Sequence, residues 1–280
     1  MRWTSIINNI LLKPFGIRIV RTNDDHKFSL CDEESILLRL INKVGNVEKF
    51  YVDIGASDGI QMSNTLHLAK LNWNRLCYEC DSNKFAKLAN FYQNYPKVNL
   101  CCTKVTPLNV CDFFKAYGVS NNFGILSIDV DSYDYFILDA LLCSYRPSII
   151  CAEINEKIPP PLEFTILFKE SYAWDVSHFY GMSICQLEKL CKHFDYALVQ
   201  LEYNNAFLIS KKLSYGEELT AKEAYESGYL RKKDRKEKFP WNKDMECILN
   251  MTPKQSVDFL KKYFKKYEGK YSLSYNKECV

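Results

Sequence analysis

The stretch Phe50-Tyr51-Val52-Asp53-Ile54-Gly55-Ala56-Ser57-Asp58-Gly59 is the part of the chain that decides its fold. It begins as a short apolar run, which is typical of a buried parallel strand. It ends in a loop with glycines at 55 and 59, and glycine allows positive φ angles and close approach of a ligand. Open α/β sheets bind nucleotides where a strand breaks into such a turn. A dinucleotide fingerprint needs a second glycine where Ser57 stands, so this stretch does not match it. Residues 53–59 instead follow the pattern D-x-G-x-x-x-G. A tight turn without a ligand stays an alternative.

The segment from residue 50 to 210 alternates apolar strands with helical stretches, which predicts a doubly wound α/β fold with a mostly parallel sheet. The last two strands are separated only by residues 202–204, too short for a crossover, so we expect a terminal antiparallel hairpin. A nicotinamide-binding domain usually lacks that reversed strand. The seven predicted strands are 50–54, 75–79, 97–102, 123–129, 148–154, 195–201 and 205–210.

Helical patterns predict additions at both ends of this sheet domain. We divide the chain into an N-terminal helical cover (1–48), a Rossmann-like domain (49–212) and a charged, helical C-terminal extension (213–280). The cover contains a predicted helix at 35–44, and a second amphipathic helix is predicted at 183–194. Thr106-Pro107 should open a further helix.

The C-terminal extension has two features of its own. Its last helix, opened by Thr252-Pro253, carries an apolar stripe that could dock on the body, form an oligomer contact or lie on a membrane surface. The basic run 231–236 is broken by an acid and followed by Glu237, so we interpret it as a solvated helix or linker. The stripe consists of Val257, Leu260, Phe264 and Tyr267.

The composition narrows the class of protein. The chain has 280 residues, 47% of them hydrophobic, which suffices for a packed core. A formal net charge of only +3 argues against a nucleic-acid partner. No segment has the roughly 18 continuous apolar residues of a membrane span, and residues 1–20 do not resemble a signal peptide. We expect a cytoplasmic protein without integral membrane contact that binds a small-molecule partner. A homodimer is one of the assemblies that would fit.

The twelve cysteines do not predict disulfides, because they are scattered and many lie inside apolar runs, where a free thiol packs as a small hydrophobe. Cys77-x-x-Cys80 resembles half of a zinc site, but no second pair follows at a suitable spacing.

Glu79 ends the second predicted strand, twenty residues after Gly59. An acid at this place in nucleotide-binding α/β sheets accepts both ribose hydroxyls, because a carboxylate offers paired acceptor oxygens. Asp81 could take this role if the strand ends two residues later. An ordinary surface acid is the alternative.

A third acidic segment, Leu126-Ser127-Ile128-Asp129-Val130-Asp131-Ser132-Tyr133-Asp134, follows the fourth strand. If the strand persists, Asp129 and Asp131 lie on the same side, where like charges need a cation, a donor or a raised pKa. The fifth strand ends at Glu153 and Asn155. Asp129, Glu153 and Asn155 therefore form an oxygen-only set that suits Mg²⁺. In the metal-free alternative, Asp129 positions a cofactor amino group, Asp131 is the base, and Glu153 and Asn155 bind substrate.

Three segments together resemble S-adenosylmethionine (SAM)-dependent methyltransferases of the FkbM type. D-x-G-x-x-x-G looks like motif I of class I methyltransferases, and the resemblance covers roughly residues 48–212. It implies a seven-stranded class I fold and SAM as cofactor. The segments are 51–65 (Y-V-D-I-G-A-S-D-G-I-Q-M-S-N-T), 126–135 (L-S-I-D-V-D-S-Y-D-Y) and 146–155, followed by three prolines. The cofactor-binding residues it implies are Asp53, Gly55, Ala56, Ser57, Gly59, Asn64, Glu79 and Asp129.

The segment I-D-V-D-S-Y-D is also similar to the I-D-x-D-x-Y segment of macrocin-type, magnesium-dependent sugar O-methyltransferases. By position, this similarity makes Asp129 a metal ligand and Asp131 the base. This chain has Glu-Ile-Asn at strand five, where that group has adjacent aspartates.

A hydroxyl acceptor needs a base, because it is a poor nucleophile at neutral pH. Asp131 fits that need, and His178 is the second candidate, in an aromatic loop expected to overhang the site. A structural histidine is the alternative. Trp174, Tyr180 and Tyr133 could stack on a sugar or cover the cofactor, and the prolines 159–161 should wall the carboxyl ends of the strands.

The sequence therefore predicts a SAM-dependent methyltransferase that O-methylates a small hydroxylated acceptor. A sugar, a glycan precursor, or a phosphorylated or nucleotide-linked intermediate of surface-glycan or natural-product biosynthesis would fit. A second hypothesis is a non-catalytic Rossmann-like module that contacts a partner or membrane through its C-terminal extension.

Overall fold

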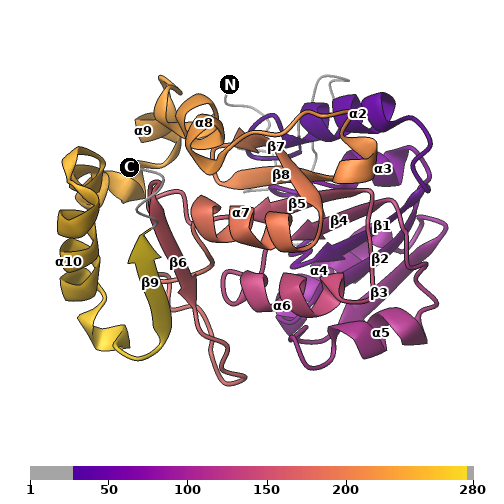
Figure 1. Ribbon diagram of the computed structural model, residues 1–280. Coiled ribbons are helices and arrows are strands. Elements are labelled where there is room, and N and C mark those ends of the chain that lie inside the picture. Colours follow the sequence, from indigo (N-terminus) through magenta and orange to yellow (C-terminus); the bar gives the residue numbers. More distant parts are fainter. Residues whose placement is uncertain (1–27, 276–280) are drawn as a thin grey trace, which may run out of the picture.

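The computed structural model describes residues 28–275, and most of them surround one large twisted sheet (Figure 1). The sheet has seven strands in the order β3-β2-β1-β4-β5-β8-β7. The first five are parallel, and β8 runs antiparallel to both β5 and β7. The predicted sheet with its terminal hairpin is therefore confirmed. The strands are β1 (Phe50–Ile54), β2 (Asn74–Glu79), β3 (Val98–Cys102), β4 (Ile125–Ile128), β5 (Ile149–Glu153), β7 (Tyr196–Glu202) and β8 (Asn205–Ser210).

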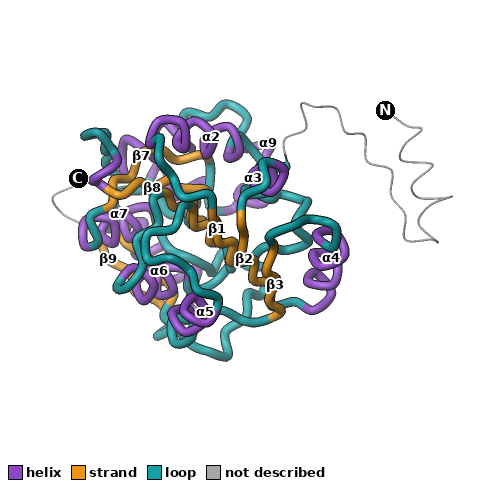
Figure 2. Tube along the Cα trace, turned by 90° about the vertical axis from the view of Figure 1, so that its right-hand side faces the viewer, coloured by secondary structure: helices purple, strands orange, loops and turns teal. Residues whose placement is uncertain are grey.

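Helices cover both faces of the sheet, because alternate strand residues are apolar on both sides. Tyr51 of β1 belongs to the core that includes α2, α3 and α4, while its neighbour Val52 belongs to the core that includes α5, α6 and α7. Figure 2 shows β1, β2 and β3 side by side between α4 and α5. These helices are α2 (Glu33–Val44), α3 (Leu66–Lys70), α4 (Ser82–Tyr92), α5 (Val110–Ala116), α6 (Asp134–Leu142) and α7 (Ile184–His193).

A second, two-stranded sheet was not predicted. In it β6 (Leu162–Ile166) pairs antiparallel with β9 (Tyr271–Tyr275), so the C-terminal extension joins a segment of the central domain. Helix α10 (Pro253–Tyr263) packs on this sheet, with Leu260 and Phe264 fully buried. Docking on the body is thus the outcome for the apolar stripe. The division at residues 48 and 212 stays a prediction.

Short helical turns build the rest of the extension. The basic run was interpreted as solvated, which holds for Arg231, Lys233 and Lys236 but not for Arg235, whose side chain is only 11% exposed. Arg231 pairs with Glu226 at 2.9 Å and Lys232 with Glu202 at 2.7 Å, pairings that were not expected. The turns are η3 (Lys211–Leu213), α8 (Ala221–Tyr225), the π-helical η4 (Glu226–Leu230), α9 (Arg235–Lys238), η5 (Pro240–Asp244), η6 (Glu246–Asn250) and η7 (Lys265–Tyr267).

Two local predictions need correction. Helix α5 begins one turn later than Thr106-Pro107, because the Asn109 side chain accepts the Thr106 N–H at 2.7 Å and closes a turn first. The prolines 159–161 do not border the pocket at the strand ends; they line a separate hollow together with α8 and the start of α10.

Between residues 28 and 275 no helix could cross a membrane. The eleven cysteines of that range are all free thiols.

Candidate functional site

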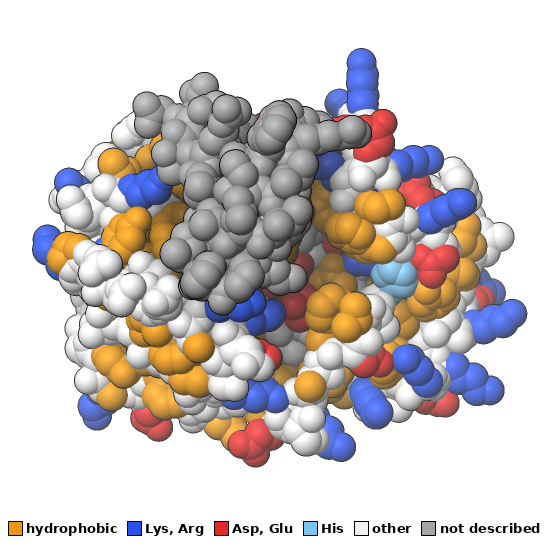
Figure 3. Space-filling view, turned by 180° about the vertical axis from the view of Figure 1, so that it is seen from behind, with side chains coloured by type: hydrophobic (Ala, Val, Ile, Leu, Met, Phe, Trp, Pro, Cys, Tyr) orange, Lys and Arg blue, Asp and Glu red, His pale blue; other side chains and the backbone are white. Residues whose placement is uncertain are grey.

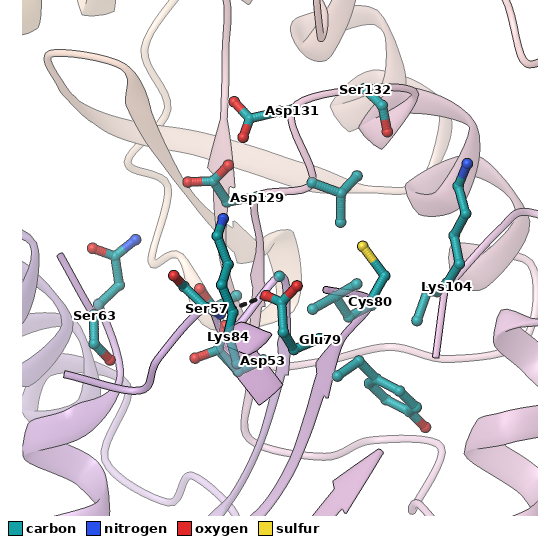
Figure 4. A pocket seen from close by; sticks show the side chains of 18 of the residues that line it. Asp53, Ser57, Ser63, Glu79, Cys80, Lys84, Lys104, Asp129, Asp131 and Ser132 are labelled. Carbon is teal, nitrogen blue, oxygen red and sulfur yellow. Dashed lines mark hydrogen bonds between the residues drawn. The ribbon is translucent and has the colours of Figure 1, made fainter. Parts of the chain in front are cut away.

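A pocket lies at the carboxyl ends of β1, β2 and β4 (Figure 4), where nucleotide ligands bind in sheets of this kind. On the face opposite that of Figure 1, acidic side chains lie inside a central hollow beside hydrophobic and basic ones (Figure 3). The pocket contains most of the cofactor residues that the sequence predicted. Those that line it are Asp53, Gly55, Ala56, Ser57, Asn64, Glu79 and Asp129.

The two glycines of the first loop serve packing between protein segments. Gly55 has φ +93°, and a Cβ added there would lie 1.8 Å from the backbone oxygen of Asp129. Gly59 has φ +74°, and a Cβ there would lie 2.6 Å from Leu88 of α4. Gly59 is not part of the pocket lining. Both positions therefore require glycine, Gly55 because the loop crosses directly over the end of β4.

Glu79 is held in the pocket by two backbone donors. Its Oε2 accepts the Ser57 N–H at 2.8 Å, and its Oε1 accepts the Asp81 N–H at 2.7 Å. Asp81 itself is exposed and caps α4 by accepting the N–H groups of Asn83 and Lys84. This arrangement answers the question left open by the sequence: Glu79, rather than Asp81, presents its carboxylate to the pocket.

Asp53 lies at the floor of the pocket and is almost completely buried. Burial raises its pKa to about 6, although the Thr65 hydroxyl donates to its Oδ2 at 2.6 Å and opposes that rise. Asn64, on the pocket wall, directs its amide toward Cys151 Sγ at 3.8 Å.

Three carboxyl groups meet on the β4–β5 side. One oxygen from each of Asp129, Asp131 and Glu153 lies within 4.8 Å of the other two. Like charges at this distance repel one another unless a proton or a cation relieves them. Burial, followed by the neighbouring acids, raises the pKa of Asp129 and that of Glu153. For Asp131 burial raises the pKa, and Lys84 and Lys157 oppose it.

Asp131 reaches this cluster from a turn instead of from an extended strand. Strand β4 ends at Ile128, and Asp131 has φ +52°, so the expected strand alternation does not place it. The turn is fixed by Asp134, whose carboxylate accepts the N–H groups of Val130 and Ser132 at 2.9 and 3.1 Å. Burial raises the pKa of Asp134 to about 6.

Four of the predicted site residues are absent from the pocket lining: Gly59, Glu153, Asn155 and His178. Asn155 is fully buried, and its amide donates to the carbonyls of His178 and Tyr180 at 2.9 and 3.0 Å. Its Oδ1 finds no hydrogen-bond partner within the described chain. His178 is bound through Nε2 to Asp244 at 3.0 Å, so it has a structural partner in the C-terminal extension.

The sequence analysis missed two lysines of the pocket. Lys84 projects from the first turn of α4 toward Asp129 (Figure 4). Lys104, which follows β3, donates from Nζ to the carbonyls of Glu170 and Tyr172 at 2.8 and 2.6 Å. Neither belongs to a recognisable motif, and only the relative placement of the strand ends brings them to the site.

The strand order and the reversed strand beside β5 decide the architecture. It is the class I methyltransferase fold. A SAM-dependent methyltransferase from Aquifex aeolicus is similar at 9% identity and a TM-score of 0.40, over 65% of this chain and 90% of that one. A SAM-dependent methyltransferase from Clostridium acetobutylicum is similar at 12% identity and a TM-score of 0.41, over 73% of this chain and 96% of that one. A putative O-methyltransferase from Klebsiella pneumoniae is similar at 13% identity and a TM-score of 0.41, over 74% of this chain and 96% of that one.

These likenesses concern the fold alone. No protein-family model matches the sequence, and no curated protein does. The residues of the pocket therefore carry the evidence for a function.

Proposed function

We propose that this protein is a SAM-dependent methyltransferase that transfers a methyl group to an oxygen of a small hydroxylated acceptor. The observation that carries the proposal is the Glu79 carboxylate. Each of its oxygens accepts one backbone N–H, from Ser57 and Asp81, and keeps further acceptor capacity on the pocket side. A fixed carboxylate with free lone pairs suits the two hydroxyls of a ribose.

The charge of the pocket supports SAM over a dinucleotide. Its lining includes the acids Asp53, Glu79, Asp129 and Asp131, which favour a positively charged sulfonium and oppose a diphosphate. A diphosphate would also need free N–H groups in the first loop, and the Ser57 N–H is taken by Glu79. A nicotinamide cofactor therefore fits this pocket poorly.

The acid cluster supplies what an O-methylation requires from the protein. When bound, SAM supplies a methyl group on a positively charged sulfur. Asp131 is the base we propose for the acceptor hydroxyl, because it lies in the pocket lining and both Lys84 and Lys157 favour its charged form. His178 is held by Asp244 outside that lining.

The same cluster fits a divalent cation. Asp129, Asp131 and Glu153 offer oxygens within 4.8 Å of one another, and hard oxygen donors are the ligands of Mg²⁺. The unpartnered Oδ1 of the buried Asn155 is a further oxygen on the same strand end. Asp129, Glu153 and Asn155 would hold Mg²⁺ and leave Asp131 as the base, and the bound cation would lower the pKa of an acceptor hydroxyl. The similarity to macrocin-type enzymes favours a sugar or glycan precursor, or a phosphorylated or nucleotide-linked intermediate, as acceptor.

The proposal is tested by calorimetry of the full chain with SAM and with S-adenosylhomocysteine (SAH). We expect Glu79→Ala to weaken SAH binding by about 100-fold, because hydrogen bonds to a charged group contribute about 1.5–3 kcal/mol each. Glu237→Gln, an exposed acid of α9, is the matched control and should bind like the wild type. Asp131→Asn should keep SAH binding but lower the rate at which SAH is formed by about 10²–10⁴-fold. This rate is measured in a screen of sugar phosphates and nucleotide sugars as acceptors.

A folded wild-type protein that produces no heat with SAM or SAH would remove the proposal. Binding of NADH in a fluorescence titration would then favour an oxidoreductase. Binding of neither ligand would favour the non-catalytic module.

A further inference from the structure

The loop between β6 and α7, residues 167–181 (the rim loop), contributes no residue to the lining of the candidate site but is bonded to two residues that line it. Lys104, which lines the pocket, binds the carbonyls of Glu170 and Tyr172. At the other end of the loop, the Gly181 N–H donates to the carbonyl of Ser132, which also lines the pocket, at 2.8 Å. Both ends of this rim loop are therefore attached to the pocket wall.

The middle of the rim loop is attached to the C-terminal extension instead. The Tyr267 hydroxyl lies 2.7 Å from Ser177 Oγ and donates to Asp175 Oδ2 at 2.5 Å. Its ring stacks on Phe179, with centroids 3.9 Å apart and an interplanar angle of 6°. Tyr267 is only 8% exposed, whereas the side chain of its partner Asp175 is 44% exposed.

The residue between the two hydrogen-bonded side chains has an unfavourable backbone conformation. Val176 has φ +61°, in the left-handed region that a β-branched residue rarely adopts. It is 80% exposed, so packing of its side chain does not hold it there. The Tyr267 hydroxyl is bound to Asp175 on one side of this turn and to Ser177 on the other. Trp174 also spans the turn, because its Nε1 donates to the Ser177 carbonyl at 2.8 Å.

The turn is connected to the segment that follows β5 through residues next to it in the chain. Phe179 and Tyr180 follow directly, and the Asn155 amide binds the carbonyls of His178 and Tyr180. The Tyr180 hydroxyl accepts from Lys157 Nζ at 2.7 Å and donates to Glu156 at 3.1 Å. Displacement of the turn would therefore move groups that lie directly after the acidic end of β5.

We propose that Tyr267 is a positioning residue, whose hydroxyl fixes the strained turn at Val176 and thereby holds the rim loop 167–181 in place as a preformed wall on the acceptor side of the pocket. The word acceptor rests on the proposed function. The role of the C-terminal extension is then to complete this wall, since Lys266 adds a second bond to Asp175 at 3.1 Å. Glu79 and the first loop are fixed by other contacts, so SAM binding does not depend on Tyr267.

The test is hydrogen exchange of the backbone amides of residues 173–181 in the full chain, with the SAH dissociation constant measured in parallel. Tyr267→Phe keeps the stacked ring and removes the hydroxyl. We expect exchange in this segment to rise about tenfold, with the SAH dissociation constant within about twofold of the wild type. Tyr271→Phe is the matched control, because the ring centroids of Tyr271 and Phe179 lie 5.8 Å apart in the same aromatic cluster. No hydrogen bond of the Tyr271 hydroxyl is found within the described chain.

A second variant separates positioning from general loosening. Val176→Asn places a residue that tolerates positive φ at the exposed turn, and we expect it to reverse at least part of the increased exchange of Tyr267→Phe. With whichever sugar phosphate or nucleotide sugar supports turnover, Tyr267→Phe should raise the KM for that acceptor and leave the KM for SAM unchanged.

Equal exchange in Tyr267→Phe and Tyr271→Phe would overturn the inference, as would an increase spread over the central sheet, or a Val176→Asn variant that restores nothing. A wild-type protein that binds no SAH removes the proposed function, while the exchange comparison still decides whether Tyr267 fixes the loop.

Discussion

The two sides of the pocket satisfy their carboxylates in different ways. On the β1–β2 side, Glu79 is held by two backbone N–H groups, and Asp81 by two more at the start of α4. On the β4–β5 side, Asp129, Asp131 and Glu153 face one another at less than 5 Å, and burial raises the pKa of each. The first side is complete as folded, whereas the second needs a proton or a cation.

This difference indicates separate tasks for the two sides. A carboxylate fixed by backbone donors is a rigid acceptor, which suits recognition of a ligand. Carboxyl groups that repel one another exchange protons near neutral pH, which suits proton transfer or metal binding. The two sides touch at Gly55, whose Cα lies against the backbone of Asp129.

The largest effect is expected where the two sides touch. Gly55→Ala places a Cβ 1.8 Å from the Asp129 oxygen at φ +93°, so the loop and the end of β4 must separate. We expect a loss of about 3–5 kcal/mol in the free energy of unfolding, from the left-handed backbone together with overpacking. Urea denaturation measures this loss.

Gly45→Ala is the matched control for backbone conformation. Gly45 has φ +82°, and a Cβ there would meet nothing within 4 Å. We expect a loss of only about 1–2 kcal/mol. Equal losses in the two variants would show that the contact with Asp129 adds nothing.

An intermediate effect is expected from the acid cluster, as a dependence of stability on pH. Burial and the neighbouring acids raise the pKa of Asp129 from 3.8 to about 8 in the folded protein. The folded state therefore binds more protons than the unfolded chain between these two pH values, and it loses stability as the pH rises from one to the other. In EDTA, Asp129→Asn should match the wild type near pH 5 and exceed its free energy of unfolding by at least about 1 kcal/mol near pH 8.5. Urea denaturation at the two pH values measures the difference.

The exposed acid Asp112 of α5 provides the control, since Asp112→Asn should leave the pH dependence unchanged. Adding Mg²⁺ at pH 8.5 should narrow the gap between Asp129→Asn and the wild type, because a cation stabilises the charged cluster of the wild type alone. A gap that stays constant with Mg²⁺ would remove magnesium from the proposal.

The smallest effect is expected at the cap of α4. Asp81→Ala removes the acceptor of the Asn83 and Lys84 N–H groups, at a cost of about 1 kcal/mol. Thr252→Ala removes the capping box of α10 at a similar cost. We expect only Asp81→Ala to weaken SAH binding, by a few-fold, because the Asp81 N–H also holds Glu79. Calorimetry and urea denaturation compare the two variants, and equal SAH affinities would contradict this link.

Much of the fold could be predicted from local patterns. The seven strands of the main sheet and the hairpin of β7 and β8 were expected within two or three residues, because apolar runs and short connections are local signals. The ends of these strands carried Glu79 and Asp129 to one edge of the sheet, as parallel strands require.

Pairings between distant segments left no such pattern. Strand β6 is only five residues long and pairs with β9 more than 100 residues later, so neither could be recognised alone. His178 was expected as a candidate base, but its partner Asp244 lies 66 residues away in a segment of unassigned role. The lysines of the pocket were missed for the same reason.

Local patterns in the chain were enough to predict the central sheet, the glycine loop and the acids that follow the strands, because hydrophobic periodicity and turn residues involve only near neighbours. The folded protein was needed to learn which acids are held by backbone donors, which repel one another, and that Tyr267 binds both sides of the turn at Val176. Those contacts join segments far apart in the chain, so their distances and burial exist only once the chain has folded.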